Sequence, residues 1–439
     1  MSKEIQMNTL NQYETNYQND KQAKAMRRAL AKNELDSIAF VSESTANTKC
    51  QFSIDIPTLK VANQQASGRC WLFAGLNILR EEVAKKCELE EFELSQNYDS
   101  FYDKLEKINY MMETCIELKD RPADDRTLTW VLQTGVQDGG QWDMLVSVIQ
   151  KYGVVPQSVM PETYQSNHTR TMNQLINTKM RQFCAKIRHL SDEEIQALKE
   201  KTLEEMYGLL CTCFGVPPKT FDFEYVDKHS NYHCVKDLDP HTFYEKYVGI
   251  DLNDYISIIN APTKDKPFNH IFTVNYLGNV VGGNPIYYLN LELNEFKTLV
   301  LKQLQHKELV WFGCDCGKDG DRQLGIWDDQ AYDYQSAFNI DFSMSKEDML
   351  DYRQAAMNHA MVFTGVNVEE DHPTKWKVEN TWGDDKANKG YYVMSDTWFD
   401  RYVFQAVVNK KYLSQAQLEL LNSEVIVLNP WDPMGTLAK

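Results

Sequence analysis

The sequence predicts an α+β fold in which a helical lobe is followed by a β-rich lobe. Apolar residues recur at helical spacing behind Cys70, at Leu72, Leu76 and Leu79. From about residue 308 onward the apolar runs are short and strand-like. We therefore divide the chain into a polar N-terminal segment (1–54), a helical lobe (55–164), a mainly helical insertion (165–300), a β-rich lobe (301–428) and a C-terminal arm (429–439).

The first two segments are expected to be mainly helical. The polar N-terminal segment contains one helix-like stretch, residues 20–33, which is rich in Lys, Arg and Ala. In the helical lobe, Cys70 heads the main helix. A second helix is predicted over residues 141–152, because Trp142 and Leu145 fall with Val148 and Ile149 on one face.

The insertion carries a clear helix start. Ser191 followed by Glu194 forms a capping-box pattern, and Ile195 and Leu198 continue it at helical spacing. An insertion of this length either makes contacts between subunits or elaborates the lobe on which it sits. The sequence leaves both alternatives open.

The β-rich lobe is predicted from short apolar runs separated by polar and glycine-containing stretches. Runs of this kind are typical of strands in a packed sheet. The predicted strands are 309–313, 360–366, 376–378 and 390–394.

Cys70 is a candidate nucleophile. The segment Gln64 to Trp71 places one thiol directly before an amphipathic helix. Unpaired N–H groups and the positive end of the helix dipole in a first turn favour a thiolate, which attacks carbonyl carbon at neutral pH. A buried cysteine that only packs is the alternative, because free cysteines are among the most buried residues.

A cysteine nucleophile needs a base and a group that orients the base. His359 stands at the mouth of one predicted strand, and Asn380 ends the next strand along the chain. Adjacent strands can bring these two side chains together. Most of the other histidines occupy polar, irregular or helical stretches and are expected at the surface.

In the order Gln64, Cys70, His359 and Asn380, these residues resemble the papain-type cysteine peptidases. The stretch from Ser67 to Trp71 matches the Cys-Gly-[Ser/Ala]-Cys-[Trp/Tyr] signature of that group, except that Ser67 replaces the first cysteine. The disulfide partner of that cysteine in secreted relatives is also absent, because Gln137 stands at its place. This double absence fits a reducing compartment.

A glycine pair and the separation between Cys70 and His359 refine the resemblance. Gly139 and Gly140 match a pair whose bare backbone resembles a docking rail for an extended peptide, so we expect them to bind substrate. His359 follows Cys70 by 289 residues, against about 130 to 150 in the secreted enzymes. The interval must therefore contain a large insertion.

This long spacing resembles the bleomycin hydrolase and bacterial aminopeptidase C branch. The same resemblance extends to Arg69, to the segment from Trp311 to Asp315 and to the Asp-Pro-Met-Gly sequence of the C-terminal arm. The resemblance extends from about residue 55 to residue 439. It implies a papain-like two-lobed fold, with a helical lobe, a β-barrel-like lobe and a large helical insertion. It also implies an arm that lies in its own active-site cleft and a barrel of six subunits.

The resemblance assigns chemical roles. Cys70 attacks a peptide carbonyl and His359 protonates the departing amine, while Asn380 orients the imidazole and Trp382 covers that hydrogen bond. The Gln64 amide and the Cys70 backbone N–H are expected to bind the oxyanion.

The C-terminal arm carries the specificity hypothesis. If it occupies the non-primed side of the cleft, a terminal carboxylate at Lys439, or at Ala438 after trimming, can meet the α-ammonium group of a substrate. The cleft then works as an aminopeptidase on peptides with free amino termini, and bleomycin-like amides are further possible substrates. A papain-like endopeptidase, a broad thiol amidase or esterase, and a non-catalytic scaffold or nucleic-acid-binding protein are the alternatives. A frayed chain end is the alternative for the arm itself.

Composition limits the partners, cofactors and cellular compartment that we expect for the protein. The formal charge of −17 opposes binding to nucleic acid, and we expect no such partner. No apolar run suggests a secretion signal or a membrane span, so we expect a cytoplasmic protein. The ten cysteines are accordingly expected to be free thiols. Cys211, Cys213, His229, His233 and Cys234 fit the spacings of zinc sites poorly, and we expect neither a metal nor a cofactor.

Overall fold

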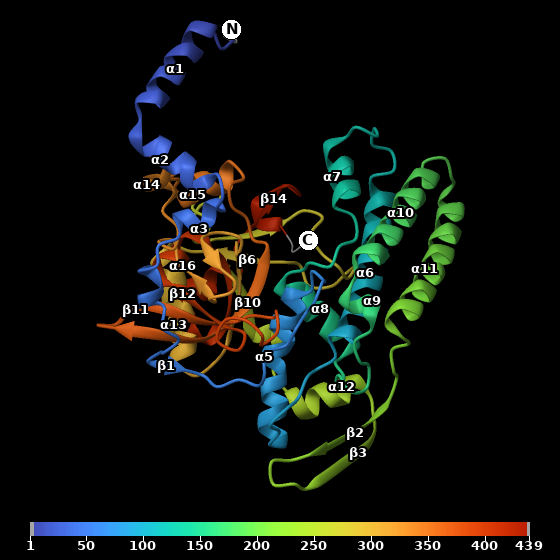
Figure 1. The fold of residues 1–439 in the computed structure, drawn as a ribbon. Coiled ribbons are helices and arrows are strands. Elements are labelled where there is room, and N and C mark those ends of the chain that lie inside the picture. The colour runs from blue at the N-terminus through green and yellow to red at the C-terminus, as the bar shows by residue number, and fades with distance from the viewer. Residues whose placement is uncertain (1–3, 437–439) are drawn as a thin grey trace.

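The computed structural model describes residues 4–436 and has a helical half beside a large mixed sheet (Figure 1). The helices of the first half are α1 (Met7–Asn19), α2 (Lys21–Leu30), α3 (Leu35–Ala39), α4 (Ser44–Asn47), α5 (Cys70–Cys87), α6 (Gln96–Glu117), α7 (Arg126–Thr134), α8 (Trp142–Tyr152), α9 (Tyr164–Asn167), α10 (Arg170–Ile187) and α11 (Asp192–Phe214). The later helices are α12 (Pro240–Phe243), α13 (Leu293–Gln305), α14 (Tyr334–Phe338), α15 (Lys346–Asp351), α16 (Asp396–Tyr402) and α17 (Gln415–Leu420). Four short turns are η1 (Tyr244–Val248, a π-helix), η2 (Leu252–Asp254), η3 (Lys410–Tyr412) and η4 (Pro433–Gly435).

Twelve strands form the large sheet, in the order β14-β5-β6-β4-β13-β7-β10-β11-β12-β9-β8, with β1 paired to β10. They are β1 (Ile54–Asp55), β4 (Tyr255–Ile259), β5 (His270–Val274), β6 (Tyr288–Asn290), β7 (Val310–Cys314), β8 (Gly320–Asp321), β9 (Ile326–Trp327), β10 (His359–Glu369), β11 (His372–Glu379), β12 (Tyr391–Ser395), β13 (Val403–Asn409) and β14 (Val425–Leu428). A separate hairpin contains β2 (Phe221–Val226) and β3 (Tyr232–Leu238).

The predicted helices and strands are present, with small shifts at most ends and with β10 and β11 longer than predicted. Cys70 begins α5, residues 142–152 form α8, and Ser191 caps α11 with the predicted capping box. The four predicted strands correspond to β7, β10, β11 and β12. The two lobes share one continuous hydrophobic core, in which α5 packs against β10.

The region 165–300 differs from the mainly helical insertion expected there. Helices α10 and α11 fit that description, but residues 221–290 contain five strands, and β4, β5 and β6 belong to the large sheet. Strands β4 and β6 are buried on both faces and β5 is buried at three of its five positions, so none shows the strict alternation that marks a half-exposed strand.

The cysteines also differ from expectation, since Cys115 and Cys184 form a disulfide. Their Cα atoms lie 5.7 Å apart where α6 packs against α10, within the range that a disulfide spans. The expectation of ten free thiols is therefore wrong for this pair. Two cysteines 69 residues apart in sequence show no regular spacing from which their contact could be read. The other eight cysteines are free.

Candidate active site

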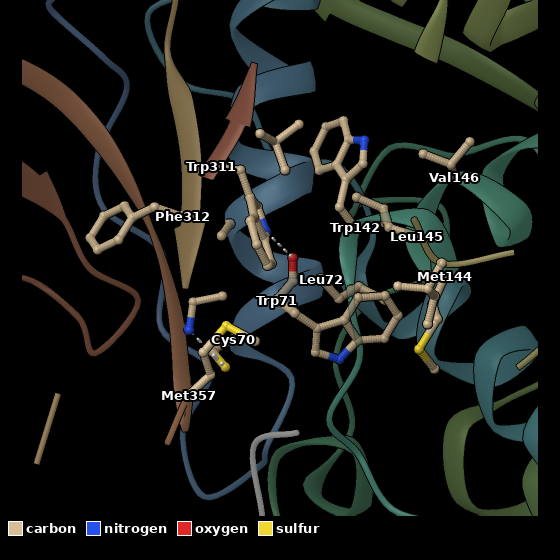
Figure 2. Close-up of a cluster of buried hydrophobic side chains, with 14 of the residues drawn as sticks. Cys70, Trp71, Leu72, Trp142, Met144, Leu145, Val146, Trp311, Phe312 and Met357 are labelled. Carbon is tan, nitrogen blue, oxygen red and sulfur yellow. Dashed lines mark hydrogen bonds between the residues drawn. The ribbon is translucent and has the colours of Figure 1, made fainter. Parts of the chain in front are cut away.

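Cys70 lies at the first position of α5, the helix that packs against β10 of the sheet. Its side chain is 1% exposed. The backbone N–H of Ala360, at the start of β10, donates to Cys70 Sγ at 3.4 Å. Figure 2 shows Cys70 at the edge of a buried cluster, with Met357 beside its sulfur and Trp71 and Trp311 joined by a hydrogen bond. The thiol is thus held between a helix start and a strand start.

His359 and Asn380 meet as the sequence suggested. Strands β10 and β11 are antiparallel, with Val362 opposite Glu379, so the first residue of β10 and the residue after β11 lie at the same end. His359 Nε2 and Asn380 Oδ1 are 2.8 Å apart. The ring of Trp382 stacks on the imidazole, with 4.9 Å between centroids and 26° between planes.

The bond to Asn380 determines the tautomer of His359. An amide oxygen can only accept, so Nε2 carries the proton and donates it. Nδ1 is left with a lone pair that can accept a proton from a thiol. Cys70 and His359 line the same small cavity, together with Gly140, Gln141 and Thr436.

Burial opposes charge on both groups. It raises the pKa of the Cys70 thiol to about 11, although the backbone N–H groups of Ala360 and Trp71 lower it in part. It lowers the pKa of His359 to about 4, although the bond to Asn380 acts in the other direction. Burial therefore opposes the thiolate that the helix start favours, because desolvation acts against the N–H groups there.

Gln64 is buried close to these residues. Its segment runs beside residues 381–382, since Gln64 N donates to the Thr381 carbonyl at 2.8 Å. The Thr381 hydroxyl donates to Gln64 Oε1 at 2.5 Å, and Gln64 Nε2 donates to the Ser67 carbonyl at 2.6 Å. In the described part of the chain Gln64 is not among the residues that line the cavity beside Cys70. Its amide hydrogens are nevertheless directed toward the loop that leads to Cys70.

Asp138 is a residue that the sequence analysis missed. Its carboxylate accepts a hydrogen bond at 3.0 Å from the backbone N–H of Gly68, in the loop that precedes Cys70. It accepts another at 2.8 Å from Lys104 Nζ. Thr169 and Asn173 of the α10 region also donate to it. Burial alone would raise its pKa, but Lys104 and these donors hold the pKa well below its usual range. The only signal in the sequence was its place before Gly139.

Arg69 is the second anchor of this loop. It is 3% exposed and makes a bidentate pair with Glu162, at 3.0 and 2.8 Å. A buried bidentate pair restricts the residue before the nucleophile more than a single bond would.

The glycine pair lies against the nucleophile's neighbour. A Cβ on Gly140 would come within 2.5 Å of Trp71 Cε2, so no other residue fits there without a shift. Gly139 is buried, and its carbonyl accepts from Lys107 Nζ at 2.7 Å. Gly140 lines the cavity, whereas the role of the pair as a docking rail remains a prediction.

The C-terminal arm reaches this cavity. Lys266 Nζ pairs with Asp432 Oδ2 at 2.9 Å, and both side chains are buried. The Tyr288 hydroxyl donates to the Met434 carbonyl at 3.2 Å, and Gln141 Nε2 donates to the Thr436 carbonyl at 3.1 Å. Thr436 lines the cavity with Cys70. The predicted binding residues Ala438 and Lys439 lie outside the described residues.

In residues 4–436 no three His, Cys, Asp or Glu side chains are grouped so as to hold a metal ion. Over the same residues no helix has the length and apolar character that crossing a membrane requires.

Comparison with known proteins gives full-length matches. The model of the Peptidase C1-like family matches residues 4–435. Aminopeptidase C of Lactobacillus delbrueckii subsp. lactis is 46% identical over 100% of this chain and 99% of its own. Bleomycin hydrolase of Rattus norvegicus is 41% identical over 86% of each chain. The crystal structure of PepW from Lactobacillus rhamnosis HN001 has a TM-score of 0.98 and 47% identity, with all of both chains covered.

Proposed function

The chain belongs to the Peptidase C1-like family and is a papain-like cysteine aminopeptidase, and on this premise we propose that Cys70, His359 and Asn380 carry out its reaction. The observation that carries the proposal is the 2.8 Å bond between His359 Nε2 and Asn380 Oδ1 beside the buried thiol. It leaves Nδ1 as the nitrogen that takes the thiol proton.

The reaction begins with proton transfer from Cys70 to His359. Because the transfer creates one negative and one positive charge side by side, it costs less than charging either buried group alone. The thiolate attacks the peptide carbonyl, and the imidazolium protonates the amine that departs. Water then hydrolyses the thioester, with His359 acting as the base.

The oxyanion formed in this attack is assigned two donors. The Cys70 backbone N–H lies in the first turn of α5, where it has no partner within the helix. The Gln64 amide is the second donor. Its oxygen accepts from Thr381 and one of its N–H groups donates to the Ser67 carbonyl, so the second N–H is the one assigned to the oxyanion.

The arm restricts the cleft to substrates with a free amino terminus. Thr436 already lines the cavity with Cys70, so the three residues that follow have little distance to cover. The carboxylate of Lys439, or of Ala438 after trimming, then pairs with the α-ammonium group of the substrate, and Gly139 and Gly140 bind its backbone.

The experiment compares matched fluorogenic aminoacyl and acetyl-aminoacyl amides. We expect the wild type to cleave only the free amino termini, the Cys70→Ala variant to cleave neither, and a chain without residues 436–439 to cleave both. Cys50→Ala, a free cysteine outside the site, is the control and should match the wild type. Equal cleavage of blocked and free substrates by the intact chain would favour the endopeptidase or broad amidase alternative.

The setting of the enzyme is part of the same proposal. Its substrates are peptides, it acts in the cytoplasm, and six copies assemble into one particle. Six chains of 51.0 kDa give a mass of about 306 kDa. The exposed apolar residues of α1 support self-association.

A further inference from the structure

Arg322 lies beside the reacting groups but has no part in the mechanism above. Its guanidinium carbon is 4.6 Å from the centre of the Trp382 ring, and that ring lies 4.9 Å from the His359 ring. The two separations together put the cation within about 9.5 Å of the imidazole centre. After burial, which is the main cause, Arg322 also lowers the pKa of His359.

The backbone that carries Arg322 is held in place. It lies in the short hairpin of β8 and β9, in which Gly320 pairs with Trp327 and Asp321 with Ile326. The Tyr392 hydroxyl donates to the Arg322 carbonyl at 3.2 Å. The backbone of the residue is therefore held in place, while the residue is exposed to solvent.

The guanidinium group is free to bind a ligand. Within residues 4–436 the Arg322 side chain has no ion-pair or hydrogen-bond partner, and its one cation–π contact is with the face of Trp382. A face contact of this kind leaves the N–H edge of an arginine available. In a protein with a formal charge of −17, an unpaired cation at the site is a specific attraction for an anion.

The chemistry places Arg322 on the leaving-group side. His359 protonates the departing amine, so the residues after the scissile bond extend past the imidazole. Gly140 and Thr436 of the arm line the cavity with Cys70, whereas Trp382 and Arg322 are not among its lining residues in the described part of the chain. The part of a substrate that follows the scissile bond extends past His359, and it therefore reaches Trp382 and then Arg322.

We propose that Arg322 binds the terminal carboxylate of short peptides that have one or two residues after the scissile bond. The reach fits this length, because an extended residue advances the chain by about 3.3–3.6 Å and arginine is long and flexible. A guanidinium group matches a carboxylate with two parallel hydrogen bonds. The inference rests on the proposed function and adds a preference for di- and tripeptides with a free carboxylate.

The test measures kcat/KM for a dipeptide and a tripeptide, each as the free acid and as the C-terminal amide. We expect the wild type to prefer the free acid by roughly three- to tenfold, as for a partly exposed charge pair. In Arg322→Gln this ratio should fall to about one. In Arg322→Lys it should lie between the two values, because lysine keeps the charge but loses the paired geometry.

Arg28→Gln, an exposed arginine on α2, removes the same charge far from the site and should keep the wild-type ratio. The ratio compares two substrates within one variant, so a general loss of activity or stability does not change it. An equal ratio in the wild type and Arg322→Gln overturns the proposal, as does a wild-type ratio of one. If the wild type cleaves neither form while remaining folded, the proposed function itself is wrong.

Discussion

At the scale of single residues, burial shifts the pKa values of Cys70 and His359 in opposite directions. The pKa of Cys70 is raised to about 11 and that of His359 is lowered to about 4. Between these values the pair holds one proton, which either group can carry. Below about pH 4, His359 is protonated and cannot accept the thiol proton. Above about pH 11, the proton needed by the leaving amine is gone.

The predicted result is a broad plateau of kcat/KM through neutral pH, with an acid limb near pH 4 and an alkaline limb near pH 11. The measurement is kcat/KM against pH, over the range in which circular dichroism shows the fold intact. An acid limb near the ordinary histidine pKa of about 6.5 would contradict this prediction. It would mean that the open, substrate-bound site solvates His359.

Asn380 is predicted to act by orienting His359. Asn380→Ala removes the acceptor of the 2.8 Å bond, so the imidazole is free to adopt the other tautomer or to turn. We expect kcat to fall about 10²-fold with little change in KM, because misplaced catalytic groups carry costs of this size. Asn388→Ala, exposed on the loop after Trp382, serves as the control. Unchanged kcat in the Asn380 variant would show that Trp382 alone is sufficient to hold the ring.

At the scale of elements, Asp138 joins the loop before Cys70 to α6 and to the start of α10. Asp138→Asn leaves Lys104 buried without its charge partner. We expect a loss of about 3–5 kcal/mol in the free energy of unfolding, as for one partner removed from a buried pair. Urea denaturation measures it, with Asp124→Asn, an exposed carboxylate, as the control. A loss no larger than in the control would mean that water replaces the carboxylate.

The arm gives a second prediction at this scale. Lys266→Met breaks the buried pair with Asp432 that holds the arm before it reaches the cavity. We expect the variant to gain cleavage of acetylated aminoacyl amides, because a loosened arm no longer closes the non-primed side. The neighbouring exposed Lys264→Met is the matched control. If Lys266→Met also cleaves only free amino termini, the contacts of Tyr288 and Gln141 hold the arm without the ion pair.

The same elements show what sequence reasoning could and could not provide. Helices with one apolar face and strands with short apolar runs were predictable, and so were His359 and Asn380 at the ends of adjacent strands. The strands β4 to β6 were not, because buried strands carry no periodicity. The contact of Cys115 with Cys184 and the bonds of Asp138 were also out of reach. They depend on how α6 packs against α10, and local pattern does not encode such packing between distant segments.

At the scale of the whole molecule, one helix stands outside the common core. In Figure 1, α1 projects away from the rest of the chain, and none of its residues is buried. Its apolar side chains are exposed, with Met7 at 71%, Tyr13 at 60% and Leu10 at 42%. A helix of 13 residues without packing is marginal in water. Its apolar residues form the surface that another copy of the chain would cover in the proposed assembly.

Removal of residues 1–19 is accordingly predicted to break the assembly. We expect the full chain to elute with the mass of six copies, about 306 kDa, and the shortened chain with a smaller mass. Multi-angle light scattering on a sizing column measures both.

Leu10→Asp with Tyr13→Asp should reproduce the effect of the deletion, because charges cannot be buried in an apolar contact without a partner. Gln12→Ala with Asn16→Ala, which changes polar residues of the same helix, should leave the mass unchanged. Equal masses for the full chain and the double aspartate variant would show that α1 does not make the contact, and the assembly would then have to be formed by other surfaces, such as the α10 and α11 pair.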